Sequence, residues 1–418
     1  MREMKPSSME WIGNIPLSWK VMPNKYLMRK KKEICPVYNG EDILSLTMKG
    51  VIVRDLDAGG KMPASFDGYQ RLEPGNLLMC LFDIDVTPRC IGLIKQAGLS
   101  SPAYSQFVLS NGADAAYYCY YYTMLDNDKT LLHLAKNLRH SLTEDQLGAI
   151  PVIVPPTDEQ RRIADFLDAK CAEIDALTAD IQTQIDTLEQ YKRSVITETV
   201  TKGLNPDAEM KDSGIEWIGV IPAHWSIHPV YTYFGERKNK NSFGREDNLL
   251  SLSYGRVIRK DINTSDGLLP ESFNTYNIVE AGDIIIRPTD LQNDKRSLRT
   301  GLVKEHGIIT SAYIDLYPLK KVDSRYFHFL LHAYDTMKVF YNMGNGVRQG
   351  LNYSEFSRLM VFEPPYTEQI AMADYLKAKV EEVDAVISDK KAQLATLDEY
   401  KKSLIFEYVT GKKEVSVS

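Results

Sequence analysis

The chain contains an internal repeat about half as long as the chain itself. Residues 4–19 return 206 positions later as residues 210–225, with the same Glu-Trp-Ile-Gly, Ile-Pro and final Trp. Residues 155–160 return 209 positions later as residues 364–369. A unit of this size is far longer than the roughly 20–50 residues of a solenoid repeat. The 418-residue chain is therefore expected to hold two copies of one domain arrangement.

Composition is that of an ordinary folded protein. Apolar residues make up 44% and charged residues 25% of the chain, which is typical of soluble domains. The N-terminal residues are polar and do not resemble a signal peptide, and no apolar run approaches the roughly 18 residues of a membrane span. The five cysteines form no Cys-x-x-Cys pair, which favours reduced thiols. We expect a cytoplasmic protein with no membrane contact.

The net charge of −6 is unevenly distributed. Basic minus acidic residues give 0 for residues 14–158 and +2 for residues 219–367. The same difference is −6 for residues 159–218 and −2 for residues 368–418. Local charge, rather than net charge, decides contact with nucleic acid, so the two less acidic segments can still present basic faces.

The two acidic segments have the pattern of long helices. The first begins near Thr157, after two prolines, and ends at Gly203; the second runs from Thr367 to about Thr410. Each would be about 60 Å long, and a helix of that length cannot bury an apolar seam alone. Either each helix packs on its own domain or, as matched seams favour, the two pack on each other as a coiled coil. The expected seam residues are Leu167, Ile174, Leu177, Ile181, Leu188, Tyr191 and Val195, then Leu376, Val383, Val386, Leu394, Leu397, Tyr400 and Leu404.

The globular segments also match each other, at short motifs separated by divergent loops. We predict an α+β fold with two homologous mixed α/β domains and two long coiled-coil helices. The predicted parts are a first domain at 1–158, a central helical repeat at 159–203, a linker at 204–218, a second domain at 219–367, a distal helical repeat at 368–412 and a tail at 413–418.

Motifs for catalysis are not convincing. The segment 363–366 resembles the Pro-Pro-Tyr loop of amino-methyltransferases, but it begins with Glu, and its counterpart at 154–157 lacks the tyrosine. The pairs His224/His228 and His328/His332 lack the further ligands that a zinc site requires. We expect no catalytic residue, no metal site and no cofactor in this chain, and hence a binding protein.

The best candidate for nucleic-acid contact is the turn containing Asn345, Gly346, Arg348 and Gln349. Glycine lets backbone amides approach a phosphate, arginine adds charge, and an amide side chain can read a base edge; an ordinary surface turn is the alternative. Further candidates in the second domain are Tyr254, Arg256, Arg259, Lys260, Arg287, Lys295, Arg296, Arg299 and Tyr313. Those in the first domain are Lys49, Arg54, Arg89, Tyr104, Gln106, Arg139 and His140.

Several of these candidates have a simpler interpretation. Tyr104 and Tyr313 could equally be core aromatics, and the basic group around Arg299 could be solvated loop charge. The densest basic run, residues 29–32, could be a solvated helix face.

Together these features resemble the specificity (S) subunit of type I restriction–modification enzymes, over almost the whole chain. The resemblance is carried by the repeated motifs at 4–16 and 210–225, at 155–167 and 364–376, and at 188–194 and 397–403, and by the Gly-rich loop at 344–351. The first half departs from that loop, since residues 136–142 contain no glycine and only Arg139 carries over.

The resemblance implies that each globular part is a DNA target recognition domain and that the helices form an antiparallel stem. It implies a chain without catalysis of its own, working in defence against foreign DNA. Its partners would be double-stranded DNA, two modification subunits that use S-adenosylmethionine to methylate adenine, and restriction subunits that use ATP and magnesium.

Two homologous units joined by antiparallel helices acquire a pseudo-twofold axis and present one domain to each strand of a duplex. Because the domains differ, we expect an asymmetric bipartite target with an unread spacer. The alternative function is a coiled-coil scaffold whose globular domains bind proteins.

Overall fold

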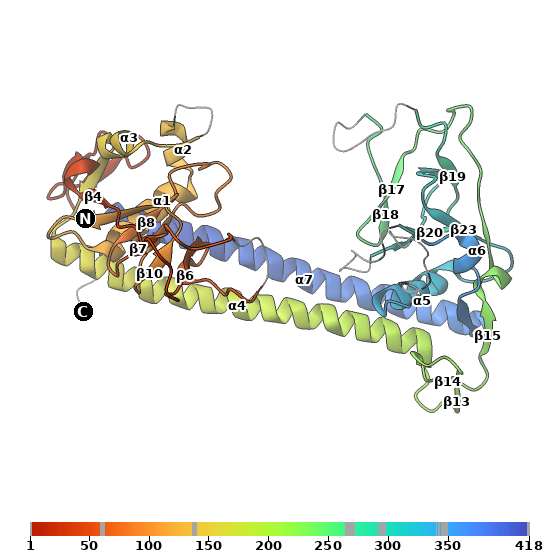
Figure 1. Cartoon of the computed structure of the whole chain (residues 1–418). Helices are drawn as coiled ribbons and strands as arrows, with labels where there is room; N and C mark the ends of the chain where they lie inside the picture. The colour runs from red at the N-terminus through yellow and green to blue at the C-terminus, as the bar shows by residue number, and fades with distance from the viewer. Residues whose placement is uncertain are drawn as a thin grey trace. The chain divides into compact units, whose positions relative to one another are not determined.

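The chain divides into two compact units. The computed structural model describes residues 2–58, 63–135, 140–263, 272–289, 291, 298–339, 341, 343 and 350–415. The first unit is Met1–Ile181 with Lys391–Ser418, and the second is Gln182–Lys390. Each unit contains one globular domain and part of each long helix, α4 (Thr157–Lys202) and α7 (Tyr366–Val409), both visible in Figure 1. The mixture of long helices and short strands confirms the predicted α+β class.

The first domain is built on a four-stranded antiparallel sheet covered by helix α1 (Ala115–Asn127). The strand order is β4 (Met28–Lys31), β11 (Ser105–Leu109), β8 (Leu77–Met79), β9 (Ile91–Leu93). Four two-stranded pairs surround it: β1 (Met4–Pro6) with β2 (Asn14–Pro16), β3 (Lys20–Pro23) with β12 (Pro151–Val154), β5 (Leu44–Thr47) with β6 (Gly50–Val53), and β7 (Gln70–Leu72) with β10 (Gly98–Ser100). The short helices are the 3₁₀ turn Asn24–Tyr26, α2 (Thr130–Leu134) and α3 (Glu144–Ala149).

The second domain repeats this plan strand for strand. Its main sheet has the order β16 (Phe234–Glu236), β23 (Ile314–Pro318), β20 (Ile284–Ile286), β21 (Thr300–Leu302), with α5 (Ser324–Thr336) packed against β21. The pairs are β13 (Met210–Asp212) with β14 (Val220–Pro222), β15 (Ser226–Pro229) with β24 (Met360–Glu363), β17 (Leu250–Ser253) with β18 (Arg256–Arg259), and β19 (Asn277–Val279) with β22 (Gly307–Ile309). The 3₁₀ turn Val230–Thr232 and helix α6 (Tyr353–Phe356) complete it.

The repeated tryptophans join each domain to the start of a long helix. The indole N–H of Trp19 donates to a carboxylate oxygen of Glu159 at 2.9 Å, and that of Trp225 donates to Glu368 at 3.0 Å. Both indoles are buried. A buried indole N–H requires a partner, so the Trp and Glu of the repeat are fixed as a pair.

Each long helix ends against a tyrosine of the domain helix. The Tyr117 hydroxyl donates to the carbonyl of Val409 at 2.7 Å, and the Tyr326 hydroxyl donates to that of Val200 at 3.3 Å. Carbonyls at a helix C-terminus lack partners within the helix, so these hydroxyls stabilise both ends in the same way. After α7, Gly411 has φ +71° and a Cβ there would collide with the Trp19 and Pro16 side chains of the first unit.

The two long helices pack on each other, antiparallel, within each unit. In the first unit Lys401 pairs with Asp175 at 2.5 Å, and in the second Lys192 pairs with Asp384 at 2.8 Å. Both residues of one pair lie 209 positions from their counterparts in the other. A contact of residue i with j that recurs with the roles exchanged is characteristic of a twofold-related interface.

Ten of the predicted seam residues are buried or half-buried, and four are exposed; each of these four lies three residues after a residue of the seven-residue (heptad) repeat, at what we call a companion position. Leu167, Ile174, Ile181, Leu376, Val383 and Leu404 are buried, and Leu188, Val195, Leu394 and Leu397 are half-buried. The exposed companions are Leu177, Tyr191, Val386 and Tyr400.

The error is one of helix geometry. The prediction placed these companions three residues after a heptad position, whereas the buried Cys171, Ile185 and Ile387 lie four residues after one. At 3.6 residues per turn, positions i+3 and i+4 fall on opposite sides of position i. Only the side of i+4 faces the partner helix.

This register predicts unequal effects for two leucines on one helix. Leu167→Ala should destabilise the chain by about 2–5 kcal/mol, because the side chain is 0% exposed and its removal leaves a cavity. Leu177→Ala, at a side chain 46% exposed, should stay within about 0.5 kcal/mol of the parent. Urea denaturation of both variants measures the difference, and equal losses would refute the register.

The cores of the two domains differ at one buried pair of polar residues. In the second domain Arg237 binds Asp283 through two nitrogens at 2.8 and 3.1 Å and lies 3.8 Å from Asp315. Both aspartates are buried, and the Asp315 oxygens have no hydrogen-bond partner among the described residues. At the matching place in the first domain, Asn76 donates to Gln106 at 3.0 Å. Burial, with the adjacent charge of Asp283, raises the pKa of Asp315 to about 8.

Asp315 should therefore make stability depend on pH. An unfolded aspartate titrates near pH 4, so between about pH 4 and pH 8 the folded chain retains a proton that the unfolded chain has lost. Stability then falls as pH rises through this window. Asp315→Asn should raise the Tm at pH 8 clearly more than at pH 5, by thermal unfolding. Asp283→Asn, which breaks the pair with Arg237, should lower the Tm; an equal shift for Asp315→Asn at both pH values would contradict the assignment.

Candidate nucleic-acid interface

In each domain a β-hairpin packs across one strand of the main sheet, at a glycine of that strand. In the second domain β17–β18 crosses β21, where a Cβ on Gly301 would lie 2.5 Å from Leu252 and 2.9 Å from Val257. In the first domain β5–β6 crosses β9 at Gly92, where a Cβ would lie 2.8 Å from Leu46 and Val51. A Cβ at either position would force these side chains to shift, whereas glycine lets the hairpin pack closely on the sheet. The glycines therefore fix where both hairpins sit.

The β17–β18 hairpin of the second domain, labelled in Figure 1, and the residue directly after it hold four of the predicted residues. Tyr254 forms its tip and is exposed. Arg256 and Arg259 are also exposed; they pair with Asp384 on α7 and with Glu305, both at 2.6 Å. Lys260 follows the hairpin directly, its backbone N–H donating to Leu249 at 2.8 Å. Surface ion pairs contribute little stability, so both arginines can exchange their carboxylates for phosphates.

The matching hairpin of the first domain holds fewer basic residues. Lys49 is exposed at its tip and Arg54 is half-buried just after it. The large exposed side chain at this tip is Met48, which the prediction missed. Its alignment with the tip of the other hairpin is the signal that could have identified it.

Other predicted residues are not part of the hairpins. Arg287 is exposed directly after β20. His140 has φ +45° and pairs with Asp85 at 2.9 Å. The half-buried Tyr313 packs against the core beneath the second hairpin, and half-buried Tyr104 stacks on Phe82 with centroids 6.2 Å apart. Burial also raises the pKa of Tyr104, which favours a structural role.

Three predicted contacts serve the interior instead. Arg299 is buried, and its guanidinium donates to the Tyr341 hydroxyl at 3.2 Å and to backbone carbonyls. Gln106 is buried and bonds backbone and amide groups on three sides. Arg89 pairs with buried Asp126 at 3.2 Å. Their donors are used inside the domains, so these residues are not surface contacts; residue type alone could not reveal this.

The remaining candidates lie outside the described residues. They are Lys295, Arg296, Asn345, Gly346, Arg348, Gln349 and Arg139.

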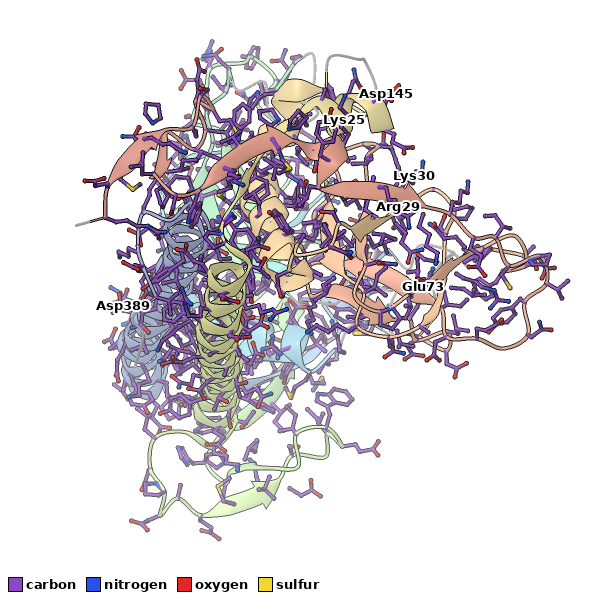
Figure 2. All side chains as sticks on the ribbon, turned by 90° about the vertical axis from the view of Figure 1, so that its left-hand side faces the viewer. Lys25, Arg29, Lys30, Glu73, Asp145 and Asp389 are labelled. Carbon is purple, nitrogen blue, oxygen red and sulfur yellow. The ribbon has the colours of Figure 1, made fainter. Side chains whose placement is uncertain are left out.

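The basic run at 29–32 includes three residues of strand β4, so its interpretation as a helix face is wrong. Lys30 pairs with Glu144 at 3.6 Å, and Lys31 pairs with Glu73. In Figure 2 Lys25, Arg29 and Lys30 lie on the same side of the first unit as Asp145 and Glu73. Charged side chains on an edge strand also prevent pairing with other chains, which is a sufficient reason for this run.

Residues considered for catalysis have structural roles. Glu363 accepts hydrogen bonds from Ser226 at 3.1 Å and Tyr233 at 2.9 Å. Burial lowers the pKa of His328 to about 3 and of His332 to about 4, so both are neutral at pH 7. Across the part of the chain that the structure describes, no three His, Cys, Asp or Glu side chains group as metal ligands. No helix within those residues is long and apolar enough to span a membrane.

Comparison with known proteins gives consistent matches. The family model of the type I restriction modification DNA specificity domain matches residues 101–187. The chain is 25% identical over 287 residues to a putative type I restriction enzyme MjaX specificity subunit of Methanocaldococcus jannaschii, covering 66% of this chain and 62% of that protein. It is 24% identical over 288 residues to the MjaVIII specificity subunit of the same organism, covering 64% and 63%. The matches thus span less than two thirds of these relatives.

The fold has a counterpart among solved structures. A chain from a study of complex assembly and conformational transition of the type I R-M system aligns with a TM-score of 0.69 at 12% identity, covering 96% of this chain and 99% of that one. At this identity the likeness shows the fold. In the family model and in both curated relatives, the chain is similar to type I restriction–modification specificity subunits.

Proposed function

We propose that this chain is the non-catalytic DNA-specificity subunit of a type I restriction–modification complex and that its two domains read the two parts of an asymmetric bipartite site. The observation that carries the proposal is the pair of hairpins. They sit on equivalent glycines, Gly92 and Gly301, and carry different residues at their tips, Met48 and Tyr254. One frame with two sets of exposed side chains suits one task performed on two different sequences.

The exchange of roles between the helix contacts supports opposite orientations of the two half-sites. Lys192 meets Asp384 and Lys401 meets Asp175 through equivalent positions of the repeat. Duplex DNA has its own local twofold axes, and proteins with twofold symmetry read half-sites of opposite direction. The number of unread base pairs between the half-sites would then depend on the long helices.

The contacts that recur unchanged in both units support the binding of two copies of one partner. The Trp–Glu joints and the paired helices recur with the same contacts in both units, and equivalent surfaces can bind identical proteins. We infer that these partners are two modification subunits, which would use S-adenosylmethionine to methylate adenine. Restriction subunits, using ATP and magnesium, would join through them. This chain would hold no cofactor of its own.

A map of methylated adenines tests the proposal. Cells expressing this chain with its modification subunits should show one bipartite motif. A chimera carrying another family member's recognition domain in place of residues 14–158 should change one half of that motif and keep the other half. A motif that survives the exchange intact would refute recognition by the first domain.

Salt dependence separates DNA recognition from the scaffold alternative. Phosphate contacts make affinity for DNA fall steeply with salt. A complex of this chain with its partners that binds proteins but shows no salt-sensitive DNA binding would favour the scaffold.

A further inference from the structure

We propose that the tips of the two hairpins are wedges: Tyr254 in the second domain and Met48 in the first insert between neighbouring base pairs of the bound duplex. This inference rests on the proposed function and assigns a specific action to one side chain in each domain.

The backbone conformation at position 254 does not favour a tyrosine. The two-residue turn Tyr254-Gly255 has φ +47° and φ +78°, the geometry in which hairpins prefer Asn-Gly or Gly-Gly. A bulky residue in this left-handed region is strained. The side chain is 72% exposed, so little burial offsets that strain. Strain kept at an exposed position is a sign of function.

The matching tip of the first domain also exposes a large side chain, although its residues lack the left-handed conformation of Tyr254. Met48 stands in the turn between β5 and β6 and is 61% exposed. Beside it is the cation Lys49, as Arg256 stands near Tyr254. Proteins that kink DNA insert apolar side chains such as methionine between base steps, and aromatic side chains stack on bases. Cations beside the wedge would contact the flanking phosphates.

The tip of the second hairpin is held firmly enough to act as a wedge. A Cβ on Gly255 would lie 3.4 Å from Leu298, so the turn rests on the domain. Arg256 pairs at 2.6 Å with Asp384, whose other oxygen receives Lys192 at 2.8 Å. These surface ion pairs contribute little stability, so the packing at Gly255 is what positions the tip. A wedge that is already in place loses little conformational entropy on binding.

The surroundings of the second tip favour a base step over a protein partner. The Ser253–Arg256 pair separates Tyr254 from the next exposed apolar residue of the hairpin, Ile258. One large side chain among hydroxyl and charged groups is too small for the apolar centre of a protein interface. The gap between two base pairs accepts one such side chain.

Tyr254→Asn is the decisive substitution in the assembled complex with its modification subunits. Asparagine suits the turn better than tyrosine, so the variant should fold at least as stably. It should nevertheless bind its cognate duplex roughly 10-fold or more weakly, the usual effect of losing one stacked base contact. Tyr254→Phe should bind like the parent. Tyr231→Ala, at a tyrosine 54% exposed elsewhere in the domain, is the control and should have little effect.

Fluorescence of 2-aminopurine, an adenine analogue that brightens when unstacked, locates the wedge. Placed in turn along each half-site, except at the methylated adenine, which a methyltransferase itself flips out, it should brighten at one step with the parent complex. The signal in one half-site should vanish with Tyr254→Asn, and that in the other with Met48→Ala. A mismatch at the affected step should restore binding by Tyr254→Asn, since those bases are already unstacked.

Two results would overturn the wedge while leaving the proposed function intact. One is parental affinity and parental fluorescence for Tyr254→Asn; the other is a loss no larger than that of Tyr231→Ala. If the parent complex itself shows no preference for its methylated motif, the proposed function fails instead.

Discussion

The mutual burial of the seams of α4 and α7 is the interaction on which the rest of the structure depends. These acidic helices of 46 and 44 residues would not be stable in isolation, because helix stability in proteins comes mainly from packing. Each seam finds its partner in the other copy of the repeat, and Lys192–Asp384 and Lys401–Asp175 set the register. The domains are then attached to helix ends of fixed position within each unit.

The attachment explains which residues the repeat preserves. The hydrogen bond of Trp19 to Glu159 lies at the start of a long helix, and that of the Tyr117 hydroxyl lies at the end of one. The equivalent hydrogen bonds form in the second unit. The exposed hairpin tips and the buried Asp283–Asp315 pair have no part in this attachment, and at these positions the two copies differ. The repeat is faithful where geometry demands it.

Much of the fold could be predicted from the sequence, because repeats and heptads are periodic signals. The helix bounds, the pairing of helices and the shared plan of the domains follow from such signals. Whether the second residue of each heptad in the seam lies at i+3 or at i+4 could not be predicted from the sequence. Leu177 and Tyr191, at i+3, are as apolar as a seam residue should be. The candidate site was harder. Arg299, buried over Tyr341, and Gln106, buried against Asn76, have the residue types of DNA contacts, and only tertiary position separates them from the exposed Arg256 and Arg259.

The division of the chain into units has a consequence for synthesis on the ribosome. The second unit is one continuous segment, Gln182–Lys390, whereas the first also needs Lys391–Ser418. Leu404, Ile405 and Val409 belong to the core of that first unit. Domains usually fold in order from the N-terminus during synthesis. Here the unit that is synthesised first cannot complete its core until α7 has emerged from the ribosome. The unit that is synthesised second can fold before it.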